Sequence, residues 1–97
     1  MDPELPDLTI ADVVVSAAGH DKGKLFYVLE TEDVWLTLVN GKDRTIEKPK
    51  RKKSKHTRKV LRSETRVADK LRLGDKVLNS ELRRDLAYLS QKLQSQT

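Results

Sequence analysis

The sequence predicts a mostly β protein with a helical tail, and two changes of pattern along the chain support this fold class. Positions 8–48 hold short runs of β-branched and aromatic residues separated by turn residues, which is typical of strands. In residues 63–97 the apolar side chains recur at helical spacing instead. A basic extension, residues 49–62, joins the two parts, and a flexible arm, residues 1–7, precedes them. A chain of this length has room for one small domain with an appendage.

The first two expected strands flank a glycine-containing loop. Residues 10–15 form the first strand, because their run of three valines is too apolar for a fully exposed ribbon. Residues 24–30 form the second, with alternate side chains on opposite faces. The loop between them, at 18–23, contains Gly19 and Gly23, which permit positive φ.

The third and fourth strands are expected to form a hairpin. The side chains of residues 33–39 also alternate between the two faces of the expected sheet, with Trp35 on one face. Asn40 and Gly41 follow at once and predict a type I′ turn, because that turn needs positive φ at both positions. Residues 44–47 then pair back as a polar fourth strand. Four such strands predict a meander that curls into a half-open barrel, and an added element or a partner would help to close so small a sheet.

Two helices are expected after the basic extension. Ser63 is a candidate N-cap of the first, and Gly74 stands where helices often end in a left-handed residue. Asn79 or Ser80 is the candidate cap of the second. The second helix carries a leucine stripe at helical spacing, formed by Leu82, Leu86, Leu89 and Leu93. Such a stripe indicates packing on the first helix or on the sheet, and the alternative is a face for a protein partner or for dimerisation.

Composition excludes several classes of protein. Apolar residues make up 36% of the chain and aromatic residues 4%, so any core is small and aliphatic. The absence of cysteine excludes disulfides, thiolate zinc sites and cysteine nucleophiles. No apolar run is long enough to cross a bilayer, and the acidic N-terminus with its prolines differs from a signal or transit peptide. We therefore expect a soluble, cytoplasmic protein that does not contact a membrane.

Charge is distributed very unevenly along the chain. Residues 48–62 hold nine Lys or Arg and no Asp or Glu, whereas residues 1–47 hold ten acidic and four basic residues, a net charge of −6. A dense cationic segment that follows a net acidic segment points to a polyanionic partner. If that partner is nucleic acid, the affinity would depend strongly on salt concentration. The alternative is a solvated, disordered charge run or a basic linker that favours solubility.

The loop at 18–23 and its flanks offer a second cationic feature. A glycine-flanked turn exposes backbone N–H groups, and Lys22 and Lys24 project from its two sides. Backbone amides and cations together suit phosphate oxygens, although an ordinary turn with solvated lysines is the alternative. Tyr27 and Trp35 are the aromatic residues that could stack on unpaired RNA bases, and their alternative is a packing role.

Residues 11–28 combine an apolar strand, Gly19, Asp-Lys-Gly-Lys at 21–24 and Val28. In this combination they resemble the KOW motif, the RNA-binding signature of several ribosomal proteins and transcription elongation factors. The Asn-Gly hairpin and Glu-Lys-Pro-Lys-Arg-Lys-Lys-Ser-Lys-His at 47–56 extend the likeness. The whole pattern is similar to the large-subunit ribosomal protein fourteen branch of archaea and eukaryotes, together with its small bacterial KOW-domain relatives.

This resemblance covers residues 10–56 and implies an SH3-like β-barrel, at 8–48, that binds structured or ribosomal RNA in a translation-related setting. Ala11 and Phe26 stand where the broad motif usually has glycine, and the ribosomal branch shares the second departure. The helical tail is more similar to the bacterial relatives. The residues expected to contact RNA lie in the loop and the basic extension, namely Gly19, His20, Lys22, Gly23, Lys24, Lys48, Lys50, Arg51, Lys52, Lys53, Lys55, His56, Arg58 and Lys59.

An enzyme is not expected. His20 and His56 lie in different segments without companion ligands, and nothing places a nucleophile beside a base. Phosphate-loop and dinucleotide motifs are missing from the sequence. We therefore expect no metal, no cofactor and no small-molecule substrate. Two other functions remain open: a protein-interaction module that docks on a translation or transcription complex through the leucine stripe, and a constitutive ribosomal subunit protein.

Overall fold

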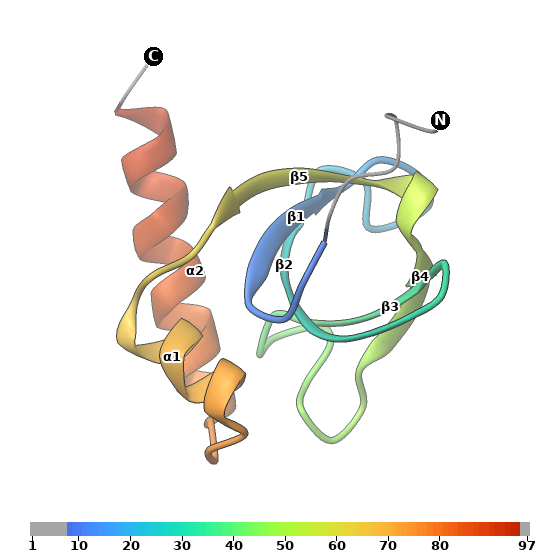
Figure 1. The fold of residues 1–97 in the computed structure, drawn as a ribbon. Helices are drawn as coiled ribbons and strands as arrows, with labels where there is room; N and C mark the ends of the chain where they lie inside the picture. The colour runs from blue at the N-terminus through green and yellow to red at the C-terminus, as the bar shows by residue number, and fades with distance from the viewer. Residues whose placement is uncertain (1–7, 96–97) are drawn as a thin grey trace.

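The computed structural model describes residues 8–95, which form a five-stranded antiparallel sheet, one short 3-10 turn and two α-helices (Figure 1). The strand order is β4-β3-β2-β1-β5. The strands are β1 (Asp12–Ser16), β2 (Leu25–Glu32), β3 (Trp35–Val39), β4 (Lys50–Lys53) and β5 (Thr57–Arg62). The turn η1 (Ser54–His56) joins β4 to β5, and α1 (Arg66–Leu73) and α2 (Asn79–Gln94) follow. The predicted mostly β fold with two C-terminal helices is therefore confirmed, while the expected arm, residues 1–7, lies outside the described residues.

The sheet is strongly curled, because only three residues link its two edge strands. β4 and β5 lie at opposite ends of the strand order, yet η1 connects them directly (Figure 1). Near η1, the backbone N–H of Ser54 donates to the carbonyl oxygen of Val34, and that of Ala17 donates to His56, both at 2.8 Å. Register shifts in the β1–β5 and β2–β3 pairs, which leave one extra residue on β5 and one on β2, add to the curvature, since bulges bend strands.

The fourth strand lies in the basic extension, so the prediction of a strand at 44–47 is wrong. Residues 44–47 contain bends, whereas β4 pairs with β3 from Trp35 opposite Lys53 to Leu38 opposite Lys50. β5 also comes from the basic stretch and pairs with β1. A strand of four cations lacks the apolar alternation by which strands are recognised, and only its pairing with β3 identifies it. Two of the five strands thus come from residues 49–62.

The connection after β3 is wider than the predicted hairpin. Gly41 has a φ of +77°, but Asn40 is not in the left-handed region, so the type I′ turn does not form. The side-chain oxygen of Asn40 instead accepts the backbone N–H groups of Lys42 and Arg44, each at 3.0 Å, and organises a longer loop before β4. A Cβ at Gly41 would lie 2.2 Å from the carbonyl oxygen of Asn79, so α2 packs directly on this backbone.

Alternating side chains of the sheet build two apolar cores, one on each face. The inner core lies inside the curl and contains Val14, Phe26, Val28, Leu36 and Leu38. The outer core lies between the sheet and the helices (Figure 1), and its buried residues include Val13, Tyr27, Val39, Val67, Ala68, Leu71, Leu82, Leu86 and Leu89. Three of the four stripe leucines are therefore buried against the protein's own sheet, which confirms the packing interpretation for them.

In α1 the predicted C-terminal glycine is confirmed, whereas the predicted N-cap is wrong. Thr65, and not Ser63, is the N-cap, because its hydroxyl oxygen accepts the N–H of Ala68 at 3.2 Å. Ser63 is buried and instead shares a hydrogen bond of 2.8 Å with the hydroxyl of Tyr27. Gly74 ends the helix with a φ of +75°, as predicted.

The start of α2 contacts the loop before β4. Leu78 precedes the helix, and its N–H donates to the Glu81 carboxylate at 2.9 Å, so neither Asn79 nor Ser80 caps the helix with its side chain. The Asn79 side-chain oxygen instead accepts the N–H of Ile46 at 2.9 Å and ties the helix to the loop. Within the described part of the chain, neither helix is long and apolar enough to cross a membrane.

Candidate nucleic-acid interface

Two lysines of β4 point toward the loop between β1 and β2. The Nζ atoms of Lys50 and Lys52 lie 2.9 and 3.1 Å from the carboxylate oxygens of Asp21. Lys52 also donates to the carbonyl oxygen of Ala18 at 2.9 Å and is only 9% exposed. These two cations neutralise a buried carboxylate and are not free for phosphate. Nothing in the sequence points to this contact, because Lys52 and Asp21 are 31 positions apart.

Asp21 is held in its ionised form. Burial alone would raise the pKa of its carboxyl, but hydrogen bonds from Lys50, Ser16 and Lys52 and the charge of Lys52 outweigh this and hold the pKa well below its usual range. The hydroxyl of Ser16 donates to the carboxylate at 2.7 Å. The result is a compact charged cluster that fixes the loop against β4.

Three further cations of the expected interface have carboxylate partners. The pairs are Lys59–Asp12 at 3.4 Å, Lys24–Asp43 at 2.8 Å and Arg51–Glu32 at 3.6 Å. Asp12 is fully buried, whereas both members of the other two pairs are exposed. Exposed ion pairs stabilise little, so Lys24 and Arg51 can exchange their carboxylate for another anion at low cost.

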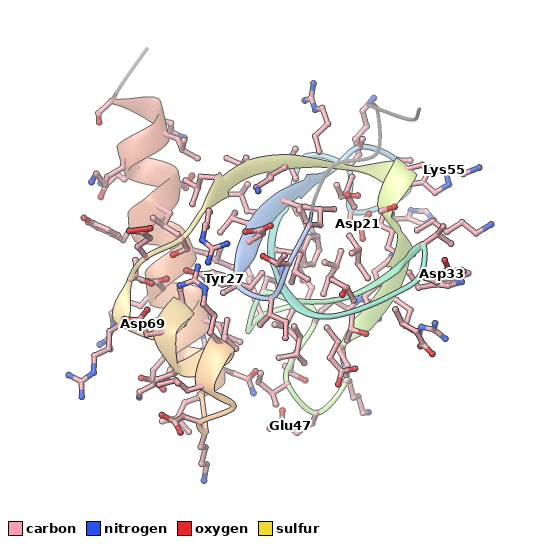
Figure 2. The ribbon with its side chains drawn as sticks, viewed as in Figure 1. Asp21, Tyr27, Asp33, Glu47, Lys55 and Asp69 are labelled. Atoms are coloured by element: carbon pink, nitrogen blue, oxygen red, sulfur yellow. The ribbon has the colours of Figure 1, made fainter. Side chains whose placement is uncertain are left out.

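The remaining cations of the expected interface are exposed and, within residues 8–95, have no carboxylate partner. They are Lys22, Lys48, Lys53, Lys55 and Arg58, and the exposed side chains of His20 and His56 accompany them. Lys55 lies on the opposite side of the sheet from the two helices (Figure 2). The free positive charge of the basic stretch is thus concentrated in the exposed part of β4, η1 and the start of β5.

A half-buried aromatic ring lies among these cations. The guanidinium carbon of Arg51 is 5.0 Å from the centre of the Trp35 ring, and the Nζ of Lys53 is 5.5 Å from it. Trp35 lies on the same face of β3 as Val39 but outside the core that the helices cover. We call Trp35, Arg51, Lys53 and Lys55 the Trp35 surface. The sequence left open whether Trp35 packs or stacks, because its cationic neighbours depend on the register between β3 and β4.

The loop between β1 and β2 does not present the free backbone N–H groups that the sequence predicted. Gly19 and Gly23 have φ of +85° and +90°, as predicted. However, the backbone N–H groups of Lys22, Gly23 and Lys24 all donate to backbone carbonyls within the β1–β2 turn region, at 2.8 to 3.2 Å. These three donors are already satisfied, so a phosphate here would be bound by side chains. The amides serve the tight turn that the two glycines permit.

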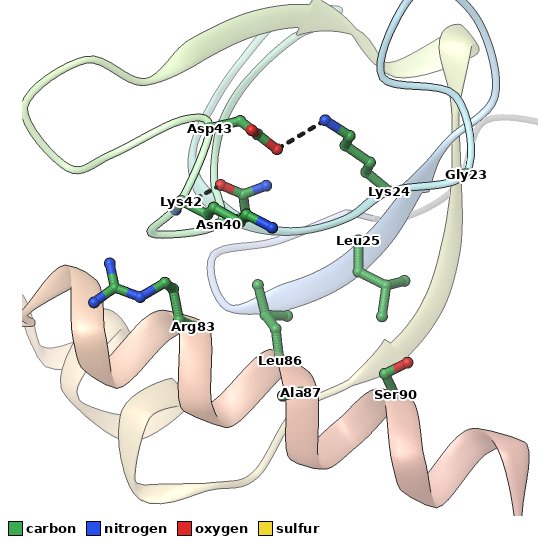
Figure 3. A pocket seen from close by; sticks show the side chains of 10 residues that line it. All are labelled: Gly23, Lys24, Leu25, Asn40, Lys42, Asp43, Arg83, Leu86, Ala87 and Ser90. Atoms are coloured by element: carbon green, nitrogen blue, oxygen red, sulfur yellow. Dashed lines mark hydrogen bonds and ion pairs between the residues drawn. The ribbon is translucent and has the colours of Figure 1, made fainter.

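A groove lies where the β1–β2 loop and the loop before β4 meet α2 (Figure 3). Its volume is about 410 Å³, and the cations Lys24, Lys42 and Arg83 line it together with Asp43. A smaller hollow of about 220 Å³ lies beyond the Lys24–Asp43 pair and is lined by both of its members. The sequence did not single out Lys42 or Arg83, because each lies in a different element and only the packing of α2 brings them together.

No group of three or more His, Cys, Asp or Glu side chains that could hold a metal ion occurs in the part of the chain that the structure describes. The charged features of the protein are therefore its exposed cations, the Trp35 surface and the groove beside α2. Comparison of the chain with protein-family models and with curated proteins found no match.

Proposed function

We propose that the protein binds RNA through the Trp35 surface and the free cations beside it. The observation that carries the proposal is the aromatic ring of Trp35 with Arg51 and Lys53 at 5.0 and 5.5 Å from its centre, together with the exposed Lys55 two positions after Lys53. An aromatic face suits an unpaired base, and neighbouring cations suit the phosphates on either side of that base. This favours single-stranded or looped RNA over a regular duplex as the target.

Most contacts in this arrangement would be made to phosphates. Each cation that neutralises a phosphate releases condensed counterions, which makes affinity depend on salt. Phosphate contacts carry no sequence information directly, so the protein would select RNA by shape and by the presence of unpaired bases. Lys48, exposed before β4, and Arg58, exposed near the start of β5, would extend the contact along the RNA backbone.

We also propose that the curled sheet is an SH3-like barrel of the KOW type, in a protein that acts on ribosomal RNA or in translation. Three features support this. The two glycines of the β1–β2 loop adopt positive φ, and η1 joins the two edge strands directly. Ala11, where the broad motif usually has glycine, has a φ of +72°, which is the backbone conformation that glycine favours. Sedimentation of ribosomes in high salt separates a constitutive subunit protein, which stays bound, from an associated factor, which dissociates.

Charge removal tests the proposed surface. With about five phosphates neutralised, the logarithm of the RNA-binding constant should fall with the logarithm of salt concentration with a slope near −4. Removing three of the cations should make this slope shallower by about 2 and weaken binding roughly a hundredfold at physiological salt. The variant combines Lys53→Gln, Lys55→Gln and Arg58→Gln, and binding is measured by titration with a labelled looped RNA at several salt concentrations.

The control removes the same charge elsewhere, in Arg66→Gln, Lys76→Gln and Arg84→Gln, which lie on the helices and the segment between them. It should keep the slope of the wild-type protein. A wild-type slope shallower than about −1, or equal losses in both triple variants, would rule out the Trp35 surface as the RNA-binding site.

Trp35 itself provides a direct readout, because it is the single tryptophan of the chain. Looped RNA should quench its fluorescence, and a duplex of the same length should quench it less. Trp35→Leu should weaken binding of looped RNA about tenfold, since stacking contributes ~1–3 kcal/mol per base. Tyr88→Leu, which removes another partly exposed aromatic ring, should leave the affinity unchanged.

A further inference from the structure

The Lys24–Asp43 ion pair bridges two loops at the edge of the groove beside α2 (Figure 3). Lys24 follows the glycine-containing loop before β2, and Asp43 lies in the loop before β4. Their side chains are 2.8 Å apart and are 47% and 42% exposed. Solvent therefore reaches the pair from the groove, and an exposed ion pair of this kind opens at low cost.

The carboxylate of Asp43 marks a position that already holds an anion. The pKa of Asp43 is lowered chiefly by its hydrogen bond with Lys24, against the opposing effect of desolvation, with further contributions from the Lys24 charge, the Asn40 amide and the Lys42 charge. Lys24 on one loop, and Asn40 and Lys42 on the other, thus favour negative charge at the Asp43 carboxylate. In the free protein, a side chain of the chain itself occupies that place.

A third cation reaches the groove from α2. The guanidinium of Arg83 donates to the carbonyl oxygen of Gly41 at 2.6 Å, which fixes the arginine against the loop while leaving other N–H donors unused. Lys42 is exposed, and within residues 8–95 it makes no direct ion pair, although its charge acts on the neighbouring Asp43. Three cations and one carboxylate line the groove, so its charge balance favours an anion.

We propose that this groove binds a phosphate group of a nucleotide, whose oxygens replace the Asp43 carboxylate at Lys24 and also contact Arg83 and Lys42. A phosphate carries more charge than a carboxylate and offers three strong acceptor oxygens, so it can accept from Lys24 while the positive charges of Lys42 and Arg83 in the same lining favour its binding. Leu25 and Leu86 form apolar walls against which the ribose or the base can rest. The site lies at the opposite end of β3 from the Trp35 surface and does not depend on RNA binding there.

Titration of the isotope-labelled protein with adenosine 5′-monophosphate, followed by NMR, tests the proposal. The amides of the two loops and of α2 near Arg83 should shift together. Lys24→Gln should weaken binding about tenfold, because it removes a charge-assisted contact. Asp43→Asn should strengthen binding about fivefold, because it removes the competing carboxylate and leaves the shape of the side chain unchanged.

Arg84→Gln is the matched control, since it removes one positive charge from the next position of α2, outside the groove lining. It should change the affinity less than twofold. Arg83→Gln should weaken binding and Arg83→Lys should restore part of it, which separates loss of charge from disturbance of the loop. Unchanged affinity in Asp43→Asn, or equal losses in Lys24→Gln and Arg84→Gln, would overturn the proposal.

Further ligands identify the source of the phosphate. Adenosine 5′-monophosphate should bind more tightly than inorganic phosphate, and equal affinity would refute the nucleotide part of the proposal. If the ligand is an RNA end, a trinucleotide RNA should bind more tightly with a 5′-phosphate than without one. If the ligand is a free nucleotide, the 5′-phosphorylated trinucleotide should bind no more tightly than adenosine 5′-monophosphate. The pair Lys53→Gln and Lys55→Gln should leave these shifts intact, so failure of the Trp35 surface would not affect this test.

Discussion

Asp21 and the two lysines that contact it explain why a strand made of cations can pair inside a sheet. Lys50 and Lys52 reach Asp21 within 3.1 Å, and the Asp21 side chain is only 10% exposed. A buried charge is costly unless it is paired, and here one carboxylate compensates two inward-pointing ammonium groups. Arg51, which alternates with them, remains exposed. The register with β3 thus turns Lys50 and Lys52 inward, and Asp21 compensates their charge.

Replacing this residue should destabilise the fold in a pH-dependent way. Asp21→Asn should lower the free energy of unfolding by about 3 kcal/mol near neutral pH, because two lysines lose their partner. The folded protein favours the ionised carboxyl, so the wild-type contribution is present above the unfolded pKa of about 3.9 and is lost as the pH falls below it. Urea unfolding should show that the difference in free energy of unfolding between wild type and variant is smaller at pH 3 than at pH 6 by about 1 kcal/mol.

The control for this prediction is Asp33→Asn, at an exposed acidic residue with a φ of +58° that asparagine also tolerates. It should change stability by less than about 0.5 kcal/mol at either pH. A difference between Asp21→Asn and wild type that is constant from pH 6 to pH 3 would contradict the ion-paired state of Asp21.

At the scale of elements, α2 is positioned by the loop before β4. The helix approaches so closely that a Cβ at Gly41 would lie 2.2 Å from the carbonyl oxygen of Asn79 and 2.9 Å from the Cβ of Leu82. Arg83 and Asn79 then hydrogen-bond to this loop. The same contact forms one wall of the groove, so the packing of α2 creates the proposed phosphate site.

Gly41→Ala should therefore cost far more than an ordinary glycine substitution. The positive φ of +77° and the displacement of α2 together should lower the free energy of unfolding by about 3–4 kcal/mol. Gly74→Ala is the matched control, because its φ of +75° is similar but nothing lies within 4 Å of the added Cβ, and it should cost about 1 kcal/mol. Equal losses in the two variants, measured by urea unfolding, would show that α2 does not pack on Gly41.

At the scale of the whole molecule, a buried polar cluster joins the sheet to the helical tail. The hydroxyl of Tyr27, on β2, contacts the carboxylate of Asp85 on α2 and the hydroxyls of Ser63 and Thr65 before α1. Thr65 also donates to Asp85 at 2.9 Å. Tyr27 lies between the curled sheet and the helices (Figure 2). The outer core is thus closed by hydrogen bonds as well as by apolar packing.

Because of this cluster, we expect the folded protein to lose stability at alkaline pH. Burial, together with the Asp85 carboxylate, raises the pKa of Tyr27 to about 12 against the opposing effect of Ser63 and Thr65. The folded protein favours the neutral phenol, so its contribution is complete below the unfolded pKa of about 10 and is lost as the pH rises toward 12. Tyr27→Phe should cost about 1–2 kcal/mol at pH 7, and this cost should shrink by about 1 kcal/mol at pH 11.

Tyr88→Phe serves as the control, since Tyr88 is 51% exposed, and it should change stability by less than about 0.5 kcal/mol at pH 7. A cost of Tyr27→Phe that is the same at pH 7 and pH 11 would argue against the buried hydrogen bond to Asp85.

Local patterns were sufficient for much of this fold. A continuous valine run indicated β1, apolar alternation indicated β2 and β3, leucine spacing indicated α2, and Gly74 indicated the end of α1. Each of these signals depends on neighbours along the chain. The excess of cations in residues 48–62 was equally visible, since charge is a property of composition. The segment that supplies most of the exposed cations could therefore be identified from the sequence, but not which of these cations have a carboxylate partner.

The sequence by itself determined where most strands and helices form, which glycines take positive φ and which segment is cationic. Tertiary structure alone decided that Lys52 is buried against Asp21 while Lys55 is exposed, that two cations lie within 5.5 Å of the Trp35 ring centre, and that Arg83 joins Lys24 at one groove. The physical reason is that ion pairs, strand register and helix packing join residues far apart in the chain, so their partners follow from the folded arrangement and not from local pattern.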